Sequence, residues 1–189
     1  MSFRQQKALA LRRTLQATAL DLFEKHGYEN VTVRQIAQGA GVSESSVYRH
    51  FQSKQQLILW DEIDSVIERG LVGNLGQGAP FDMLQKVFVE AYSDLSPDAL
   101  QSLARRAKLI DSIPEVFGAM AQGLEADRKE LQAALVAAYE RPPLEMQWVA
   151  RIALTALIAG LENWLEVETE TPLQDCIDAA FRAARTALQ

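Results

Sequence analysis

Apolar side chains recur every three or four residues along almost the whole chain, which is the spacing of amphipathic α-helices. Leu15, Ala19 and Phe23 follow this spacing, and Gly27 comes next as a residue type that commonly ends a helix. No segment alternates apolar and polar residues for long enough to predict a convincing β-strand. The pattern therefore predicts an all-α protein whose first helix spans about residues 4–26.

A short hydroxyl side chain at a helix start can accept a hydrogen bond from a backbone amide that has no partner within the helix. Three such starts follow one another after residue 30, and two of them carry the Gln three positions on that completes a capping box. They predict two short helices joined by a tight turn, and then a longer helix that fades near residue 70. The residues concerned are Thr32 with Gln35, Ser43, and Ser53 with Gln56, with Gly41 and Val42 in the turn.

Five further helices are expected after a glycine-rich loop that ends at Pro80. Their expected ranges are 81–93, 97–109, 112–139, 144–166 and 171 to the end of the chain. Ser112 with Glu115 is expected to form a capping box at one of these starts. The expected organisation is a first domain over residues 1–60 and a second domain over residues 61–189.

Composition excludes several classes of protein. Of the 189 residues, 48% are hydrophobic and the formal net charge is −6, a balance that excludes intrinsic disorder. A single cysteine, Cys176, and two histidines provide neither a disulfide nor a zinc cluster. Basic residues interrupt the early apolar runs, and the most apolar window, residues 148–161, is shorter than the roughly 20 residues of a membrane span. We therefore expect a cytoplasmic protein that has no cofactor and no contact with a membrane.

Charge is distributed unevenly along the chain, with +4 on residues 1–59 and −10 on the remainder. This asymmetry favours a polyanion as the partner of the first part, although chance variation on a solvated surface gives the same numbers. On the second short helix, Ser45, Tyr48 and Arg49 share a face that differs from the apolar one. Two short helices joined by a tight turn, with hydrogen-bonding side chains exposed, are what reading a DNA major groove requires.

The run TVRQIAQGAGVSESSVYRHFQSKQQL, residues 32–57, resembles the N-terminal domain of TetR-family transcriptional regulators. The family string Tyr-x-His-Phe-x-x-Lys-x-x-Leu stands here as Tyr48, His50, Phe51, Lys54 and Leu57. The resemblance implies a three-helix DNA-binding domain with a helix-turn-helix, followed by a helical bundle that binds a ligand and forms a dimer. The implied function is that of a homodimeric repressor, which a small, largely apolar ligand releases from double-stranded operator DNA.

The resemblance also assigns base-reading roles. Arg34 and Arg49 would read bases, because a guanidinium can bond both acceptors on the guanine edge. Glu44 would either accept a hydrogen bond from a cytosine amino group or interact favourably with the helix dipole.

Other residues of the run would contact the DNA backbone. Thr32 would present the start of its helix to a phosphate. Tyr48, His50 and Lys54 would donate hydrogen bonds to phosphates and so fix the register on the duplex. The predicted DNA-binding residues are Thr32, Arg34, Ser43, Glu44, Ser45, Ser46, Tyr48, Arg49, His50 and Lys54.

The second domain carries no sharp motif for a ligand or a partner. Its helix over residues 144–166 is apolar nearly all round, so that a second subunit is the simplest partner for its outer face. The resemblance implies a dimer through the last two helices, and Ala179 and Ala183 would allow their close approach. Arg151 is either a ligand anchor or half of an interface ion pair with Glu162. The predicted ligand-binding residues are Phe88, Tyr92, Phe117, Met120, Trp148, Arg151 and Trp164.

Regulation is expected to be a population shift. A ligand that binds better to the state with misplaced recognition helices must lower the affinity for DNA. The helix that starts at Ser53 is the expected lever, because it begins beside Lys54 and runs into the second domain.

An all-α enzyme and an interaction module without DNA are the alternatives. Asp61, Glu62 and Asp64 could bind a metal ion, but neither histidine has a nucleophile nearby in the sequence. An interaction module would leave Arg34 and Arg49 unexplained. We therefore expect a DNA-binding protein that is not an enzyme.

Overall fold

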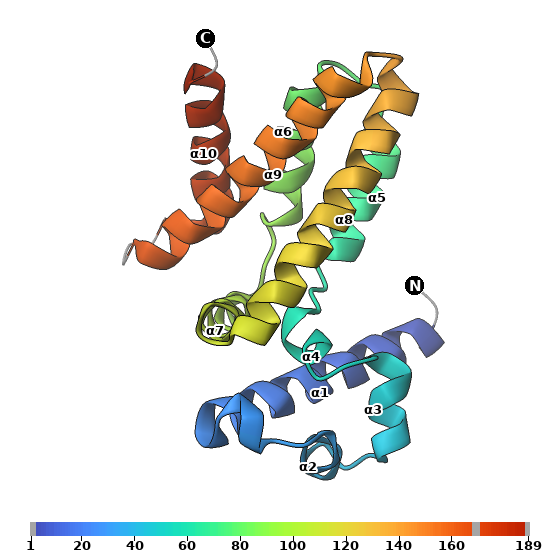
Figure 1. Ribbon diagram of the computed structural model, residues 1–189, viewed down its shortest axis with the longest axis vertical. Helices are drawn as coiled ribbons and strands as arrows, with labels where there is room; N and C mark the ends of the chain where they lie inside the picture. Colours follow the sequence, from blue (N-terminus) through green and yellow to red (C-terminus); the bar gives the residue numbers. More distant parts are fainter. Residues whose placement is uncertain (1–2, 168–170, 188–189) are drawn as a thin grey trace. The chain divides into compact units, whose positions relative to one another are not determined.

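The computed structural model describes residues 3–167 and 171–187, and within these ranges the chain forms α-helices and one short 3₁₀-helix, with no β-strand. The predicted all-α fold is therefore confirmed (Figure 1). The elements are α1 (Phe3–His26), η1 (Tyr28–Asn30), α2 (Val33–Gly39), α3 (Glu44–His50), α4 (Gln56–Leu59), α5 (Asp64–Asn74), α6 (Pro80–Ala91), α7 (Pro97–Ser112), α8 (Pro114–Tyr139), α9 (Pro143–Glu166) and α10 (Leu173–Ala187).

The described residues form two compact units, and the division does not follow a single cut in the chain. The first unit contains the residues up to Trp60 together with Pro97–Ala121. The second contains Asp61–Ser96 together with the residues from Gln122 onward. Helix α7 and the start of α8 thus pack with the first 60 residues, whereas the sequence predicts one boundary at residue 60.

The core of the first unit forms because the apolar face of α1 packs on the short helices that follow it. Leu15 of α1, Ile36 of α2 and Val47 of α3 are buried together in this core. Helices α7 and α8 complete it from a distant part of the chain, because Val116 is buried here and Ile113 packs against the cluster. The helix-turn-helix is therefore supported by residues that follow it by more than 50 positions.

Surface charges also join α7 to α1 within this unit. The guanidinium of Arg105 lies 2.6 Å from a carboxylate oxygen of Asp21 and 2.8 Å from one of Glu24. The hydrogen bonds to Glu24 and then Asp21 raise the pKa of Arg105 above its usual value.

The single helix expected from Ser53 to residue 70 is wrong, because the chain forms α4 and α5 with a break between them. Trp60 adopts an extended conformation (φ −60°, ψ 127°). Its carbonyl oxygen accepts hydrogen bonds from Gln16 at 2.8 Å and from Arg106 at 3.1 Å. These two side chains, from α1 and α7, bind the oxygen that a continuous helix would use for its own backbone.

Two predicted helix starts also differ from the structure. The Ser53 hydroxyl accepts from the Gln56 amide at 3.4 Å, but Ser53 is not the N-cap, because α4 begins at Gln56. Ser112 ends α7 and its hydroxyl donates to the Leu109 carbonyl, so it does not cap α8. Helix α8 begins instead at Pro114, whose fixed φ suits a first helical position.

The second unit is held together mainly by α6, α9 and α10, with α5 against α6. Phe181 of α10 contacts Phe81 and Phe88 of α6, with ring centroids 5.2 Å and 6.0 Å away. A Cβ at Gly160 would lie 2.6 Å from the Ile177 Cα, so α9 and α10 approach each other more closely than any side chain there would allow.

Helix α9 is long and apolar enough, by length and composition, to cross a membrane, with 24 residues and a mean hydropathy of 1.3. This corrects the expectation that the apolar stretch is too short. The core helix of a soluble protein passes the same test, and α9 packs against α6 and α10. The helix is therefore weak support for a membrane span.

Candidate nucleic-acid interface

The starts of α2 and α3 are fixed by their own side chains, as the sequence predicts. The Thr32 hydroxyl accepts from the Gln35 amide at 3.2 Å, and the Gln35 side chain accepts from the Thr32 amide at 2.7 Å. Ser43 caps α3 by accepting from the Ser46 amide at 3.2 Å. Both predicted N-caps are confirmed, and both lie at exposed helix starts.

The turn between α2 and α3 depends on Gly41, whose φ of 69° lies in the left-handed region that glycine adopts without strain. The Val42 amide donates to the Ala37 carbonyl at 2.9 Å and closes the turn. Ala37 and Val47 are buried across this turn, so α2 and α3 present their other faces to solvent.

The exposed face of α3 carries three of the predicted contact residues. Tyr48 is 51% exposed, which places it on the surface and not in the core. The Arg49 guanidinium donates to the Ser45 carbonyl at 3.4 Å and to the Ser46 hydroxyl at 3.0 Å. Arg49, Ser46 and Ser45 therefore form a cluster of hydrogen-bonding groups on an α-helix, the element that a DNA major groove is wide enough to admit.

Arg12 of α1 adds a positive charge that the sequence interpretation did not include. Its guanidinium donates to the His50 carbonyl at 3.2 Å, at the end of α3, and lies over the rings of Phe51 and Trp60. Burial, and then the charges of Arg12 and Arg49, lower the pKa of His50 below 6.5. His50 is therefore a neutral donor at pH 7, and the cations at this end of α3 are Arg12 and Arg49.

Lys54 lies between α3 and α4, and its ammonium is bound within the subunit. The Nζ atom donates to the Tyr28 carbonyl at 2.8 Å and to the Val31 carbonyl at 3.2 Å. It also lies 3.8 Å from the centroid of the Tyr28 ring. Burial, and then Glu115 and Glu29, raise the pKa of Tyr28 to about 12, so this ring is neutral and its face attracts the cation.

Comparison with known proteins identifies both parts of the chain. Residues 15–59 match the model of bacterial regulatory proteins of the tetR family, and residues 78–189 match the MftR C-terminal domain. The chain belongs to the TetR family of transcriptional regulators. It is accordingly a DNA-binding regulator of transcription.

One relative and two solved structures show how far this similarity extends. A protein of Mycobacterium tuberculosis named as the mycofactocin biosynthesis transcriptional regulator MftR is 25% identical over 168 residues, which cover 86% of this chain and 83% of the relative. The regulator FadR of Bacillus subtilis, solved with stearoyl-CoA, is 17% identical with a TM-score of 0.59 over 91% of this chain and 96% of its own. NalD of Pseudomonas aeruginosa, the secondary repressor of the MexAB-OprM multidrug efflux pump, is 20% identical with a TM-score of 0.57 over 95% and 96%. The two structures support the fold of this regulator.

The predicted ligand-binding residues of this TetR-family regulator are distributed over both units. Phe117 and Met120 belong to the first unit, and the other five belong to the second. Phe88 and Tyr92 are buried in the core of the second unit, whereas Trp148 is 58% exposed and Arg151 is also exposed. No described cavity brings these residues together.

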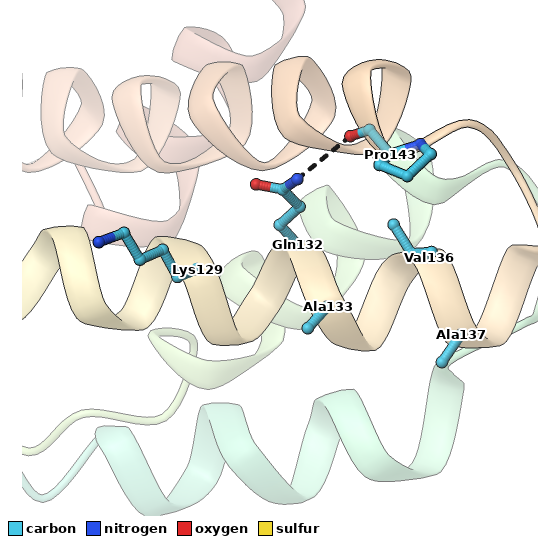
Figure 2. A pocket seen from close by; sticks show the side chains of 6 residues that line it. All are labelled: Lys129, Gln132, Ala133, Val136, Ala137 and Pro143. Carbon is cyan, nitrogen blue, oxygen red and sulfur yellow. Dashed lines mark hydrogen bonds between the residues drawn. The ribbon is translucent and has the colours of Figure 1, made fainter.

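A groove of about 460 Å³ lies instead between α8 and the start of α9, within the second unit. Figure 2 shows the polar side chains of Lys129 and Gln132 on α8, with Pro143 facing them from the start of α9. The sequence interpretation did not predict this groove, because its small apolar residues follow ordinary helical spacing and give no local signal. The lining residues are Lys129, Gln132, Ala133, Val136, Ala137 and Pro143.

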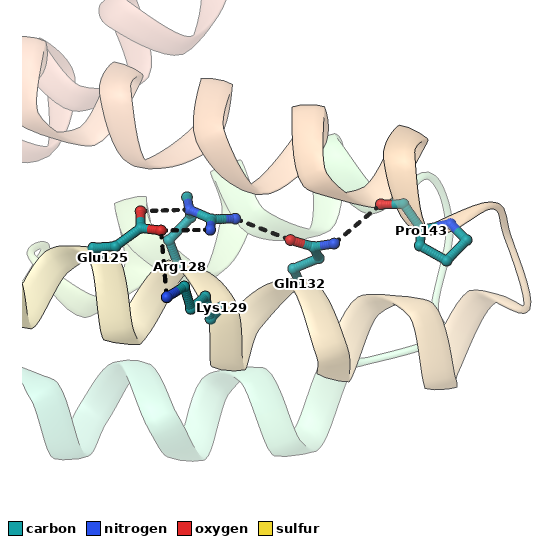
Figure 3. Close-up of polar contacts among 5 residues, drawn as sticks. All are labelled: Glu125, Arg128, Lys129, Gln132 and Pro143. Carbon is teal, nitrogen blue, oxygen red and sulfur yellow. Dashed lines mark hydrogen bonds and ion pairs between the residues drawn. The ribbon is translucent and has the colours of Figure 1, made fainter.

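A chain of polar contacts runs along one edge of this groove (Figure 3). Arg128, only 8% exposed, donates to both carboxylate oxygens of Glu125 at 2.7 Å and to the Gln132 side chain at 2.9 Å. Gln132 in turn donates to the Pro143 carbonyl at 3.2 Å, which links α8 to α9. The Arg128 hydrogen bonds lower the pKa of Glu125 to about 2.

The carboxylates considered for a metal site do not form one. Among the described residues, no group of three or more His, Cys, Asp or Glu side chains could hold a metal ion. An Asp61 carboxylate oxygen accepts from the Ile63 amide at 3.0 Å.

Proposed function

We propose that this regulator is a homodimeric repressor that binds operator DNA through α2 and α3 and is released by a small, largely apolar ligand. The observation that carries the proposal is the exposed face of α3, where Ser45, Tyr48 and Arg49 gather beside two capped helix starts. A face of this kind can reach base edges and phosphates together.

The proposed contacts divide by chemistry. Arg34 and Arg49 would read bases, and Tyr48, Ser43, Ser45 and Ser46 would bind bases or phosphates. Thr32 and Glu44 lie at helix starts, where Thr32 would approach a phosphate and Glu44 would interact with the helix dipole. His50 would donate to a phosphate as a neutral imidazole.

Dimer formation is proposed through α9 and α10. Thr155 and Ala159 of α9 are exposed, as are Ala179 and Ala183 of α10, so the outer faces of both helices carry small side chains. Small side chains allow close approach of helices from a second copy, in a four-helix bundle. Two copies are also required to read two half-sites one DNA turn, roughly 34 to 36 Å, apart.

A matched pair of charge substitutions tests the dimer. We expect Ala183→Glu to raise the dimer dissociation constant by about a hundredfold or more, because it buries an unpaired charge in the interface. Ala126→Glu, on an exposed position of α8, adds the same charge outside α9 and α10 and should leave the dimer intact. Sedimentation of both variants measures the effect, and equal dissociation constants would refute this interface.

The groove between α8 and α9 is the proposed place for the effector. Its lining is mostly apolar, with one cation and one amide that could orient a polar end. The similar FadR structure contains stearoyl-CoA, which has a long apolar chain, and such a chain is the class of ligand proposed here. Helix α8 belongs to both units, so it replaces the helix from Ser53 as the proposed connection between effector and DNA.

Titration of stearoyl-CoA and of apolar compounds without a charged group against a bound operator duplex tests the release. We expect DNA affinity to fall with at least one probe class in the wild type. Ala133→Trp, which fills the groove, should abolish this response and leave DNA affinity unchanged without ligand. A response that persists in Ala133→Trp would place the effector elsewhere, and unchanged affinity at saturation would reject that probe.

A further inference from the structure

The connection between α3 and α4 is tied to the connection between α1 and α2 by one side chain, Lys54. Its ammonium binds two carbonyls of the earlier connection, those of Tyr28 and Val31, at 2.8 Å and 3.2 Å. The Tyr28 ring covers the same ammonium, with its centroid 3.8 Å away. The side chain is partly buried as a result.

These contacts commit most of the hydrogen-bonding capacity of the ammonium. A lysine ammonium has three donors, and two of them are used here. Hydrogen bonds from a charged donor are stronger than those between neutral groups. Movement of Lys54 to a phosphate would break both bonds and remove the cation from the ring.

The position of the two carbonyls gives the contact a function. Val31 directly precedes Thr32, the N-cap of α2, so a bond to the Val31 carbonyl fixes where α2 begins. Lys54 follows α3 by four residues. The bond therefore sets the start of α2 relative to the end of α3.

We propose that Lys54 is a positioning residue for DNA binding: it holds the start of α2 in register with α3 from inside the subunit, and it is not itself a phosphate contact. This assignment extends the DNA-binding function and replaces the role that the family resemblance implies for Lys54. Without this contact the segment Tyr28–Gln35 becomes more mobile. Thr32 is then no longer held in a fixed position relative to the base-reading face of α3.

Two measurements on Lys54→Met, which keeps the apolar stem and removes the charge, test this role. The first is hydrogen exchange of the backbone amides, which we expect to accelerate in Tyr28–Gln35 and not across the rest of the first unit. The second is affinity for a duplex selected by the wild type from a random-sequence library, over a range of salt concentrations. We expect affinity to fall about tenfold with an unchanged salt dependence, because the lost bonds lie within the protein.

Matched variants complete the test. Lys25→Met removes a charge from an exposed lysine of α1 and should change neither measurement. Lys54→Arg keeps a cation with several donors and should recover the slow exchange and most of the affinity. If Lys54→Met does not fold, Lys54→Gln takes its place, because it keeps an amide donor. Its amide exchange in Tyr28–Gln35 should then be faster than in the wild type, but less so than full loss of the donor would give.

A phosphate contact would give a different result. The salt slope would then fall by about 0.9 in Lys54→Met, with unchanged exchange in Tyr28–Gln35. That result, or the absence of any change in exchange, overturns the proposal. Exchange is measured without DNA, so a failure to select any duplex would count against the proposed operator binding and leave the exchange test decisive for Lys54.

Discussion

The helix starts of α2 and α3 and the packing of the second unit are stabilised over very different distances along the chain. The two predicted caps of α2 and α3 each join residues three positions apart, Thr32 with Gln35 and Ser43 with Ser46. In the second unit, Gln132 reaches Pro143 across 11 positions, and Gln85 reaches Asp178 across 93. Local contacts can be read from a sequence, whereas long-range contacts depend on the packing of the whole unit.

The largest expected effect tests the long-range packing. Gly160→Ala should lower the free energy of unfolding by about 2 to 4 kcal/mol, because the new Cβ would lie 2.6 Å from the Ile177 Cα and α9 must move away from α10. Chemical denaturation measures the change.

Gly123→Ala is the control for this substitution. A Cβ at Gly123 meets no atom within 4 Å, so alanine should be neutral or stabilise α8 by up to about 1 kcal/mol. If both variants lost the same free energy of unfolding, the contact with Ile177 would not be the cause of the loss in Gly160→Ala.

The next effect tests the local contacts. Thr32→Ala and Ser43→Ala should each cost about 1 kcal/mol of stability, because each removes a side-chain acceptor from a helix start. Ser53→Ala should cost much less, because Ser53 is not the N-cap of α4. If Ser53→Ala cost as much stability as Thr32→Ala, Ser53 would cap a helix as the sequence predicts.

Acid stability tests the polar chain beside the groove. Glu125 has a pKa of about 2 in the folded protein, against a usual value of 4.5, so its bond to Arg128 stabilises the fold fully above pH 4.5. This contribution is lost as the pH falls from about 4.5 towards 2. The difference in melting temperature between wild type and Glu125→Gln should therefore shrink over this range. If the difference in melting temperature stayed constant, the charge of Glu125 would not contribute to stability.

The smallest expected effect concerns His50. Its pKa is lowered in the folded protein, so the unfolded chain takes up a proton first as the pH falls through 6.5. Stability from the neutral imidazole is full above pH 6.5 and declines below it. His50→Gln should remove this part of the pH dependence, as measured by denaturation from pH 7.5 to 5.5. An unchanged pH profile would contradict the cause assigned to His50.

The sequence predicts the helix starts and the turn of the helix-turn-helix well because their determinants are local. Thr32, Ser43 and Gly41 act on neighbouring backbone groups, and their roles were predictable from residue type and spacing. The break at Trp60 was not predictable in this way. It depends on Gln16 and Arg106, which are 44 and 46 positions away.

The ligand-binding residues stay a prediction, and the groove could not be predicted from the sequence for a related reason. Large side chains such as Phe88 suggest a pocket by their size, but the packing of α6 against α10 buries Phe88 in the core. The groove is lined mainly by small residues such as Ala133 and Ala137, which carry no signal of their own. Lys54 shows a further limit, since the motif identifies the residue but not the carbonyls that it binds.

Selection of duplexes from a random-sequence library by the wild type and by Arg49→Ala tests the central claim most directly. The account predicts that the wild type enriches a two-fold repeated sequence with half-sites about 10 base pairs apart, and that Arg49→Ala keeps this spacing but loses preference at one base of each half-site, at a cost of about 1 to 3 kcal/mol. Enrichment of the same sequence with the same preference by both proteins would show that α3 does not read DNA through Arg49.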